Sequence, residues 1–209
     1  MAQDKETREL LIKSAKAEFM EKGYNKASLR SICSDAGVTT GALYFFFEDK
    51  ADLFKAIVGK AVDGIFEIMQ AHFEEDEDLV AGADPYAEPD EYIDDHSEIA
   101  QLLIHHIYSN YDVAMLVLTK SQGSEYENIV DRIVEITENK SIEMMDKISE
   151  KTGKKKKLNK YMLHLVVHIV VDSFVQLVIY EPDEKKALES IKKVFNMTMH
   201  NGTETVLDC

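Results

Sequence analysis

The chain has 209 residues, of which 45% are hydrophobic and 30% are charged. This is the balance of a globular protein with one sizeable core, or of a small domain fused to a larger one. No apolar run that could cross a bilayer is expected, because the best candidate, 161–180, is interrupted by His164, His168, Asp172 and Gln176. The polar N-terminus argues against a secretory signal, and two distant cysteines argue against a disulfide framework. We expect a reduced, cytoplasmic protein outside the membrane.

Charge is distributed unevenly along the chain, whose formal net charge is −15. Residues 1–60 contain ten Lys or Arg against nine Asp or Glu, whereas residues 61–209 contain fourteen against thirty. The whole-chain charge argues against nucleic acid as a partner, because polyanions repel each other, but the acidity lies almost wholly outside the first sixty residues. The sequence therefore predicts a two-part molecule whose parts have unequal roles.

The N-terminal part contains short helical patterns separated by stop and start signals. Gly23 is expected to end the first helix, and Gly37 lies in a tight turn, at a position that favours a positive φ. Ser28, Thr39 and Asp49 are expected as N-caps, because their side chains can accept hydrogen bonds from backbone N–H groups of the first turn. The predicted helices are 5–22, 29–35, 40–46 and a long one from 49 to about 73.

The remaining chain is predicted to be helical around one acidic interruption. No Lys or Arg occurs between Lys60 and Lys120, where fifteen Asp or Glu residues do, and glycine and proline punctuate residues 76–89, which we expect to form an exposed loop. A basic turn is expected at 154–157, and no strand-like alternation is present. Further helices are expected at about 90–108, 111–120, 124–151, 158–180 and 183–199. The fold class is therefore predicted to be all-α, with about nine helices.

Two short helices joined by a tight turn have a well-known use in DNA recognition. The second helix enters the major groove while the first braces it across the backbone. In this chain the small core between the helices is expected to consist of Ile32, Ala36, Val38 and Leu43. The groove-facing side of the second helix is expected to present Thr39, Thr40, Ala42 and Phe45.

The run SLRSICSDAGVTTGALYFFFEDKADLF closely resembles the DNA-binding signature of the TetR (TetR/AcrR) family of one-component regulators. The resemblance covers roughly residues 8–58, including Phe19 and Gly23-Tyr24, and beyond it only local patterns such as VVDSFVQLVI are similar. The core element AGVTTGALYFFFEDKADL matches at Ala36, Gly37, Val38, Thr39, Gly41, Leu43, Tyr44, Phe47, Lys50 and Leu53.

The resemblance implies roles for several side chains. Thr39 and Thr40 would contact phosphate or base edges, Tyr44 would give its hydroxyl to a phosphate, and Lys50 would pair with phosphate. Ser28 and Arg30 could anchor the first helix of the motif to the DNA backbone. For Ser28 and Thr39 the alternative is that they serve only as helix caps, and Val38, Leu43 and Phe47 are expected to be core residues.

This sequence departs from the family at Phe45 and Phe46, where the family often has His or Tyr. Phenylalanine cannot donate a hydrogen bond to phosphate. Phe45, if exposed, could instead pack on a thymine methyl group. The first sixty residues also carry a net charge of only +1. The low basicity predicts modest nonspecific affinity for DNA.

The remaining two-thirds contain no catalytic motif, phosphate loop or Cys-x-x-Cys, so an enzyme is not expected and no cofactor is expected. The resemblance implies an N-terminal three-helix DNA-binding domain at 1–48. It also implies a C-terminal helical bundle at 49–209 that binds a small effector of unknown identity and forms a homodimer. Dimerisation is also expected physically, because two recognition helices are needed to read a palindrome. The helices at 158–180 and 183–199 are the expected interface.

Candidate effector-binding residues lie among the middle helices, although ordinary core packing is the alternative for each one. Nine methionines and eighteen Phe or Tyr residues suit an adaptable apolar cavity. The candidates are Phe66, Met69, Leu103, His106, Met115, Ile133, Met144 and His168.

The function predicted from the sequence is a ligand-responsive DNA-binding transcriptional regulator, a repressor released from a palindromic double-stranded operator by its effector. Two alternatives remain open. His164, His168 and Asp172 share a helical face at spacings of four, a pattern that could bind a transition metal in a metal-sensing regulator. Satisfied histidines at the dimer interface are the simpler interpretation. The second alternative is a helical interaction protein without DNA binding.

Overall fold

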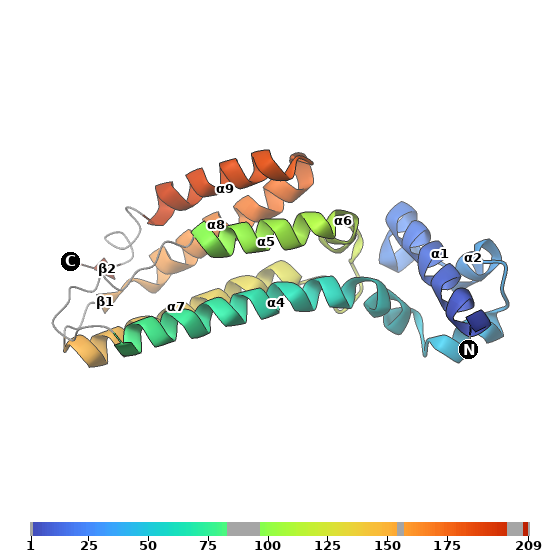
Figure 1. Ribbon diagram of the computed structural model, residues 1–209, viewed down its shortest axis with the longest axis horizontal. Coiled ribbons are helices and arrows are strands. Elements are labelled where there is room, and N and C mark those ends of the chain that lie inside the picture. Colours follow the sequence, from blue (N-terminus) through green and yellow to red (C-terminus); the bar gives the residue numbers. More distant parts are fainter. Residues whose placement is uncertain (1, 83–96, 154–156, 200–206, 209) are drawn as a thin grey trace. The chain divides into compact units, whose positions relative to one another are not determined.

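Helices dominate the computed structural model, which describes residues 2–82, 97–153, 157–199 and 207–208. Within these ranges there are nine α-helices and one two-residue antiparallel pairing of β1 (Lys157–Leu158) with β2 (Leu207–Asp208), so the all-α prediction is confirmed (Figure 1). The helices are α1 (Ala2–Lys26), α2 (Leu29–Asp35), α3 (Thr40–Phe46), α4 (Lys50–Gly82), α5 (Ser97–Ser109), α6 (Tyr111–Lys120), α7 (Ile129–Thr152), α8 (Lys160–Tyr180) and α9 (Glu184–Met199).

The chain divides into two compact units. The N-terminal unit comprises Met1–Gly64 and Ser109–Asn128, and the second unit comprises Ile65–Tyr108 and Ile129–Cys209. The helix α4 contributes residues to both units. The functional boundary expected after residue 48 concerns roles rather than compactness, and it stays a prediction.

The N-terminal unit is packed around buried aromatic rings. Phe19 of α1 packs edge-on against Phe54 of α4, with ring centroids 5.0 Å apart, and Tyr24 packs against both rings. Leu11, Ala15 and Phe19 follow one another at helical spacing and are fully buried. Because burial of a large apolar side chain stabilises by about 1.5–3 kcal/mol, this cluster fixes α1 against the start of α4.

The break predicted at Gly23 is present inside α1 rather than at its end. Gly23 has φ 75° and ψ 162°, a conformation that favours glycine, and helical hydrogen bonding resumes after it as far as Lys26. Ala27 N then donates to the carbonyl oxygen of Gly23 at 3.1 Å. The chain is thereby redirected toward the N-cap of α2.

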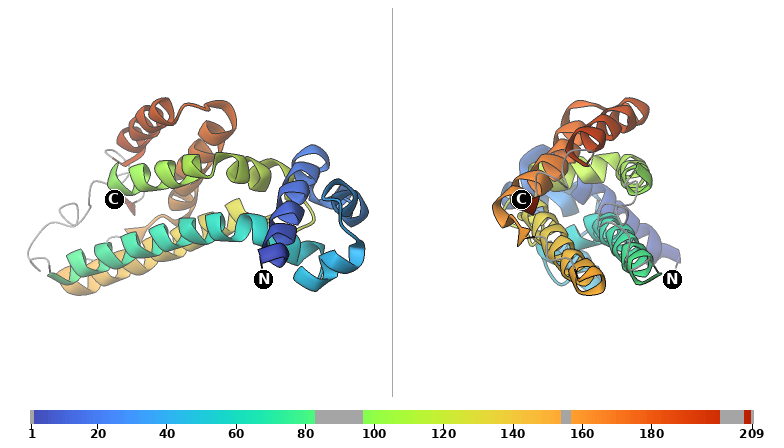
Figure 2. Two further views of the ribbon diagram at one scale, coloured as in Figure 1. Left: turned by 45° about the vertical axis from the view of Figure 1, so that its right-hand side comes forward. Right: turned by 90° about the vertical axis from the view of Figure 1, so that its left-hand side faces the viewer.

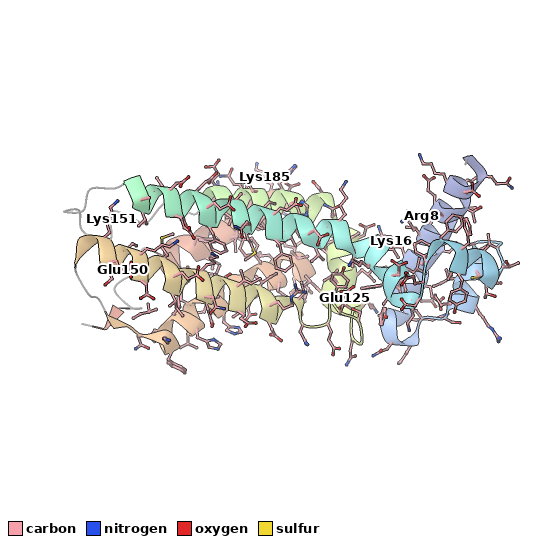
Figure 3. The ribbon with its side chains drawn as sticks, turned by 90° about the horizontal axis from the view of Figure 1, so that it is seen from below. Arg8, Lys16, Glu125, Glu150, Lys151 and Lys185 are labelled. Atoms are coloured by element: carbon pink, nitrogen blue, oxygen red, sulfur yellow. The ribbon has the colours of Figure 1, made fainter. Side chains whose placement is uncertain are left out.

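The long fourth helix runs to Gly82, so the prediction that residues 76–82 belong to an exposed loop is wrong. Tertiary contacts with α7 account for the extra turns. Glu77 pairs with Lys147 at 2.7 Å and with Lys140 at 3.7 Å. Lys151 Nζ donates to the carbonyl oxygen of Ala81 at 2.7 Å, and Figure 3 labels Lys151 near the ends of α4 and α7. The acidic end of α4 is therefore neutralised by the basic side of α7, which lies alongside it in Figure 1. The rest of the predicted loop, 83–89, lies outside the described residues.

The seventh helix begins at Ile129, five residues later than the prediction of 124. Residues 121–128 form turns instead, in which Ser124 Oγ accepts from Tyr126 N at 3.1 Å and Gly123 has φ 87°. Tyr126 is 6% exposed, and its ring lies 5.9 Å from that of Phe54. Packing inside the N-terminal unit thus holds this segment. No local sequence pattern predicts that contact.

The other helix boundaries agree more closely with the sequence. The predicted helix at 111–120 is α6, and α8 and α9 each begin within two residues of the predicted starts. Asn159 Oδ1 caps α8 by accepting from Met162 N at 3.1 Å, and Asp183 Oδ1 caps α9 by accepting from Lys186 N at 3.1 Å. α5 begins at Ser97, and residues 90–96 of its predicted range lie outside the described residues, as do 154–156 of the predicted basic turn. Lys157, the last residue of that turn, pairs with Asp208.

Two apolar clusters organise the second unit. One joins α5 to α9, with Phe174 and Leu177 of α8 packed against it, and the other joins α7 to α8. Figure 2 shows these helices, with α5 in green, α7 in yellow to orange, α8 in orange and α9 in red. Their buried members are Ala100, Ile104, Ala187 and Ile191 in the first, and Val134, Leu163, Val167 and Val171 in the second.

The helix α8 is strongly apolar although most of its surface is not buried within the described structure. By length and composition alone it could cross a membrane, contrary to the expectation from its polar residues: mean hydropathy is 2.0 over its best 18-residue window, and only 22% of that window is buried. Tyr161, Leu165 and Ile169 are 69%, 36% and 51% exposed. A single chain therefore leaves an apolar face of α8 uncovered.

Candidate nucleic-acid interface

The start of α2 is held by its own cap and by a carboxylate from α1. Ser28 Oγ accepts from Ser31 N at 3.4 Å, which confirms Ser28 as the N-cap. Glu18 accepts from Ser28 N at 3.1 Å and from Ser31 Oγ at 3.0 Å, while Lys22 Nζ donates to it at 2.8 Å. Glu18 is 8% exposed, and the hydrogen bond from Lys22 holds the pKa of Glu18 below its ordinary value. Glu18 thus fixes the position of α2 on α1.

Sequence reasoning missed Glu18. The carboxylate of a capping box is sought three residues after the cap, whereas Glu18 precedes Ser28 by ten residues. One signal was present: Glu18 follows Leu11 by seven residues and Ala15 by three, so it lies on the buried face of α1. A carboxylate at such a position requires polar partners, because burying an unpaired charge is costly.

The turn between α2 and α3 has the predicted geometry. Gly37 has φ 68°, and the N–H groups of Gly37 and Val38 donate to the carbonyl oxygens of Ser34 at 3.2 Å and Cys33 at 2.9 Å. A side chain at residue 37 would be strained by this φ even though nothing crowds it. Of the expected core residues around this turn, Ile32 and Leu43 are fully buried, Ala36 is 9% exposed and Val38 is half-buried.

The helix α3 is pinned on one side and open on the other. Thr39 Oγ1 accepts from Ala42 N at 3.2 Å, which confirms the predicted N-cap. Leu43 and Phe47 are buried and hold the inner side. The expected contact residues lie at or near the surface: Thr39, Thr40, Tyr44 and Phe45 are exposed and Ala42 is half-buried, while Ser28 and Arg30 at the start of α2 are exposed.

Lys50 is engaged within the chain. Its Nζ donates to the carbonyl oxygen of Tyr24 at 2.8 Å and to that of Asn25 at 3.4 Å, and it lies 4.6 Å from the centre of the Tyr24 ring. An ammonium has three N–H donors, so the contacts recorded among the described residues leave one for a phosphate. Lys50 therefore ties the start of α4 to the end of α1 whatever else it binds.

The expected effector residues are divided between the two units. Seven of them belong to the second unit, whereas Met115 belongs to the N-terminal unit. Met69 is 5% exposed, Phe66 lies 5.3 Å below the guanidinium of Arg132, and Ile133 packs into the cluster between α7 and α8. Leu103, His106, Met144 and His168 are half-buried. Their role in effector binding stays a prediction.

A cavity of about 580 Å³ lies elsewhere in the second unit, between the last turns of α4 and α7. Five of its seven lining residues are charged, and none of the expected effector residues takes part. The lining residues are Glu77, Asp78, Val80, Ala81, Lys147, Glu150 and Lys151.

The histidines of α8 are paired with carboxylates. His164 Nδ1 lies 2.6 Å from Glu138 Oε1, and His168 Nδ1 lies 3.7 Å from Asp172 Oδ2. In the part of the chain that the structure describes, no three His, Cys, Asp or Glu side chains are grouped so that they could hold a metal ion. The metal-sensing alternative through His164, His168 and Asp172 is therefore without structural support.

Comparison with known proteins identifies the N-terminal segment. Residues 11–57 match the family model described as bacterial regulatory proteins, tetR family. The HTH-type transcriptional repressor BepR of Brucella suis biovar 1 is 48% identical over 60 residues, which is 29% of each chain. The HTH-type transcriptional regulator TtgR of Pseudomonas putida is 35% identical over 72 residues, or 34% of each chain. The chain thus spans about a third of the length of these curated relatives.

Solved structures extend the likeness to the whole fold. The structure of MexZ, described as a key repressor responsible for antibiotic resistance in Pseudomonas aeruginosa, has a TM-score of 0.59 at 13% identity, covering 97% of this chain and 98% of that one. A transcriptional regulator from Aquifex aeolicus has a TM-score of 0.52 at 19% identity, covering 91% and 98%. At such identities the likeness concerns the fold alone.

Proposed function

Because residues 11–57 match the family model of bacterial regulatory proteins, tetR family, we propose that this chain is a DNA-binding transcriptional regulator of that family, a repressor that a small-molecule effector releases from a palindromic operator. The observation that carries the proposal is the geometry of α3. This short helix is capped, anchored by Leu43 and Phe47, and open on the side that bears Thr40, Tyr44 and Phe45. In this proposal the protein acts on DNA in the cytoplasm.

In this proposal a few placed contacts supply the affinity, since the first sixty residues carry almost no net charge. Tyr44 is 58% exposed and donates its hydroxyl to a phosphate. Thr39 and Thr40 contact phosphate or base edges, Ala42 lies against the groove, and Ser28 and Arg30 anchor α2. Lys50 adds one N–H to a phosphate while its other donors hold α1.

Homodimerisation through α8 and α9 completes the binding unit. Two recognition helices about 34–36 Å apart, one turn of DNA, are required to read a palindrome. The uncovered apolar face of α8 supports this interface, because exposed apolar patches mark association surfaces, and Met197 of α9 is 74% exposed as well. A four-helix bundle of α8, α9 and their symmetry mates would bury this face.

The effector acts through α4, which contributes to both units. One end of α4 carries Lys50, and the half within the second unit carries Phe66 and Met69, which are candidate effector contacts. An effector that binds one of two conformations more tightly shifts the population toward it, with a coupling of about 1–3 kcal/mol in typical cases. Release from DNA is the direction expected from the family.

Selection from a randomised duplex library tests the function directly. Wild-type protein should recover a palindromic site, and affinity should fall steeply with salt because phosphate contacts release counterions. Tyr44→Phe removes only a hydroxyl from each protomer and should weaken binding by the dimer about a hundredfold, since a hydrogen bond to a charged group contributes about 1.5 kcal/mol and the dimer makes two of them. Fluorescence anisotropy measures both effects.

A matched control removes a charge from the same helix without touching the proposed site. Lys60 is exposed and lies about 15 Å along α4 from Lys50, at 1.5 Å per residue. Lys60→Ala should bind the selected duplex like wild type. Recovery of no palindrome would reject the proposal, and full affinity of Tyr44→Phe would reject the assignment of Tyr44.

A further inference from the structure

Phe45 is the feature of α3 that folding does not explain. It is 76% exposed, more than any other large apolar side chain in the described part of the N-terminal unit. Leu43 of α3 and Phe47, the residue just after α3, already fill the inner side of the helix. An exposed phenyl ring contributes little to the stability of the folded chain. We therefore look for the role of Phe45 in contact with a binding partner.

The ring of Phe45 is held in place although its face is open. Phe46 packs edge-on against it, with centroids 4.9 Å apart and planes at 87°. Phe46 in turn lies 6.5 Å from the ring of buried Phe47, over which the guanidinium of Arg8 stands at 5.3 Å. Three successive rings therefore connect Phe45 to the core, which makes it a preorganised apolar contact.

Gly41 lies one turn before Phe45, on the same open side of α3. A Cβ added there would meet only Thr39 Oγ1, at 3.8 Å, which is ordinary contact. Glycine weakens a helix relative to alanine, and no contact among the described residues requires it at this position. The gap that it leaves beside Tyr44 and Phe45 allows the helix backbone to approach a partner closely.

The major groove offers one apolar group among its base edges, the methyl group on C5 of thymine, which 5-methylcytosine also carries. Phenylalanine has no donor or acceptor for the remaining edges. Building on the proposed function, we propose that Phe45 is a specificity residue that packs against a pyrimidine C5-methyl group, that of thymine in an unmodified operator, once in each half-site. Phe46 positions it.

Methyl deletion in the DNA tests this contact. The probe is the tightest fluorescein-labelled duplex that wild-type protein selects from a randomised library, with each thymine replaced in turn by deoxyuracil. At one position per half-site, loss of the methyl should weaken binding about fourfold, and about fifteenfold with both half-sites replaced, as expected for one buried CH₃ per site. Phe45→Ala should bind the thymine and deoxyuracil duplexes equally.

A second arm separates the two sources of the methyl group. At the same position, duplexes with a C·G pair and with a 5-methylcytosine·G pair are compared. Wild type should prefer the methylated pair, and Phe45→Ala should bind both equally. Leu79→Ala, at a residue of α4 that is 51% exposed, is the control and should discriminate like wild type. Thermal unfolding checks that Phe45→Ala keeps the wild-type stability.

The outcomes separate this inference from the proposed function. Equal binding of thymine and deoxyuracil duplexes by wild type at every position overturns the methyl contact alone, as does discrimination that persists in Phe45→Ala. Failure to select any duplex overturns the proposed function, and the role of Phe45 with it.

Discussion

The helices α3 and α8 both expose apolar side chains, but they do so in different ways. α3 has seven residues, and its open side combines hydroxyl groups with one braced aromatic ring. α8 has 21 residues, and its open side repeats large apolar groups at Tyr161, Leu165 and Ile169, spaced by one helical turn. A few directional groups on a short helix suit recognition, whereas a long apolar face suits association.

The support behind each helix differs as well. Glu18, the caps at Ser28 and Thr39, and the buried Leu43 hold the motif around α3, so its side chains are placed before any partner binds. α8 is anchored to α7 through Leu163, Val167 and Val171, and its Phe174 and Leu177 pack against the cluster of α5 and α9, but Tyr161, Leu165 and Ile169 stay exposed. The first region is therefore held on all the sides that folding requires, while the exposed face of α8 is the part that the proposed dimer would cover.

The largest expected effect comes from a charge on the outer face of α8. Ile169→Glu would bury an unpaired carboxylate in the proposed interface and should weaken dimerisation by about 3–5 kcal/mol, more than a hundredfold. Light scattering measures the mass, and anisotropy should show a parallel loss of operator affinity. Leu102→Glu, at a residue of α5 that is 52% exposed, is the matched control and should stay dimeric. A dimeric Ile169→Glu protein would place the interface elsewhere.

A smaller effect, on stability, is expected at Glu18, which holds α2 against α1. Glu18→Ala leaves Ser28 N without its acceptor and should lower the free energy of unfolding by about 1–3 kcal/mol. Glu18→Gln can still accept from Ser28 N but loses the ion pair with Lys22, so it should cost less. Denaturant unfolding measures both. If Glu18→Ala is as stable as wild type, the cap of Ser28 alone suffices to hold α2.

Acid should remove the same contribution without mutation. The pKa of Glu18 is lowered from about 4.5, chiefly by the hydrogen bond from Lys22. A lowered pKa in the folded state means that the stabilisation is fully present above about pH 4.5 and is lost as the pH falls through the folded-state value. Unfolding of wild type and Glu18→Gln, compared from neutral pH downward, should show the two stabilities converging in acid. A constant gap would exclude Glu18 as the group that titrates.

The smallest expected effect concerns the ion pair between α1 and α6. Lys16 and Asp112 are hydrogen-bonded, which lowers the pKa of Asp112, but their side chains are 32% and 63% exposed. Exposed pairs are screened, so a double-mutant cycle with Lys16→Gln and Asp112→Asn should give about 0.5 kcal/mol or less. A coupling well above this would mean that α6 is held on α1 by charge more than by packing.

The sequence predicted most of the motif because its signals are local. Ser28, Thr39 and Asp49 cap helices within three residues of themselves, and Gly37 takes the positive φ that its turn requires. Such features depend on short-range hydrogen bonds and backbone sterics, which neighbouring residues determine.

The errors arose where partners come from far along the chain. Residues 76–82 resemble a loop in isolation, yet Lys147 and Lys151 of α7 hold them in α4. Residues 124–128 resemble a helix start, yet Tyr126 is packed onto Phe54. Ion pairs and ring contacts between distant segments produce no periodic pattern in the sequence. Each partner residue therefore fits the local pattern of its own segment and gives no sign of the contact.

The amino-acid sequence by itself determined the all-α class, the helix-turn-helix and the identity of the side chains that α3 presents, since these follow from local hydrogen bonding and helical spacing. Only the tertiary structure decided that Glu18 holds α2, that Lys50 is engaged with the end of α1, and that Phe45 is exposed on a brace of aromatic rings. Each of these depends on contacts between separate helices or on which side of a helix the core leaves open. The fold as a whole sets both, and no single segment does.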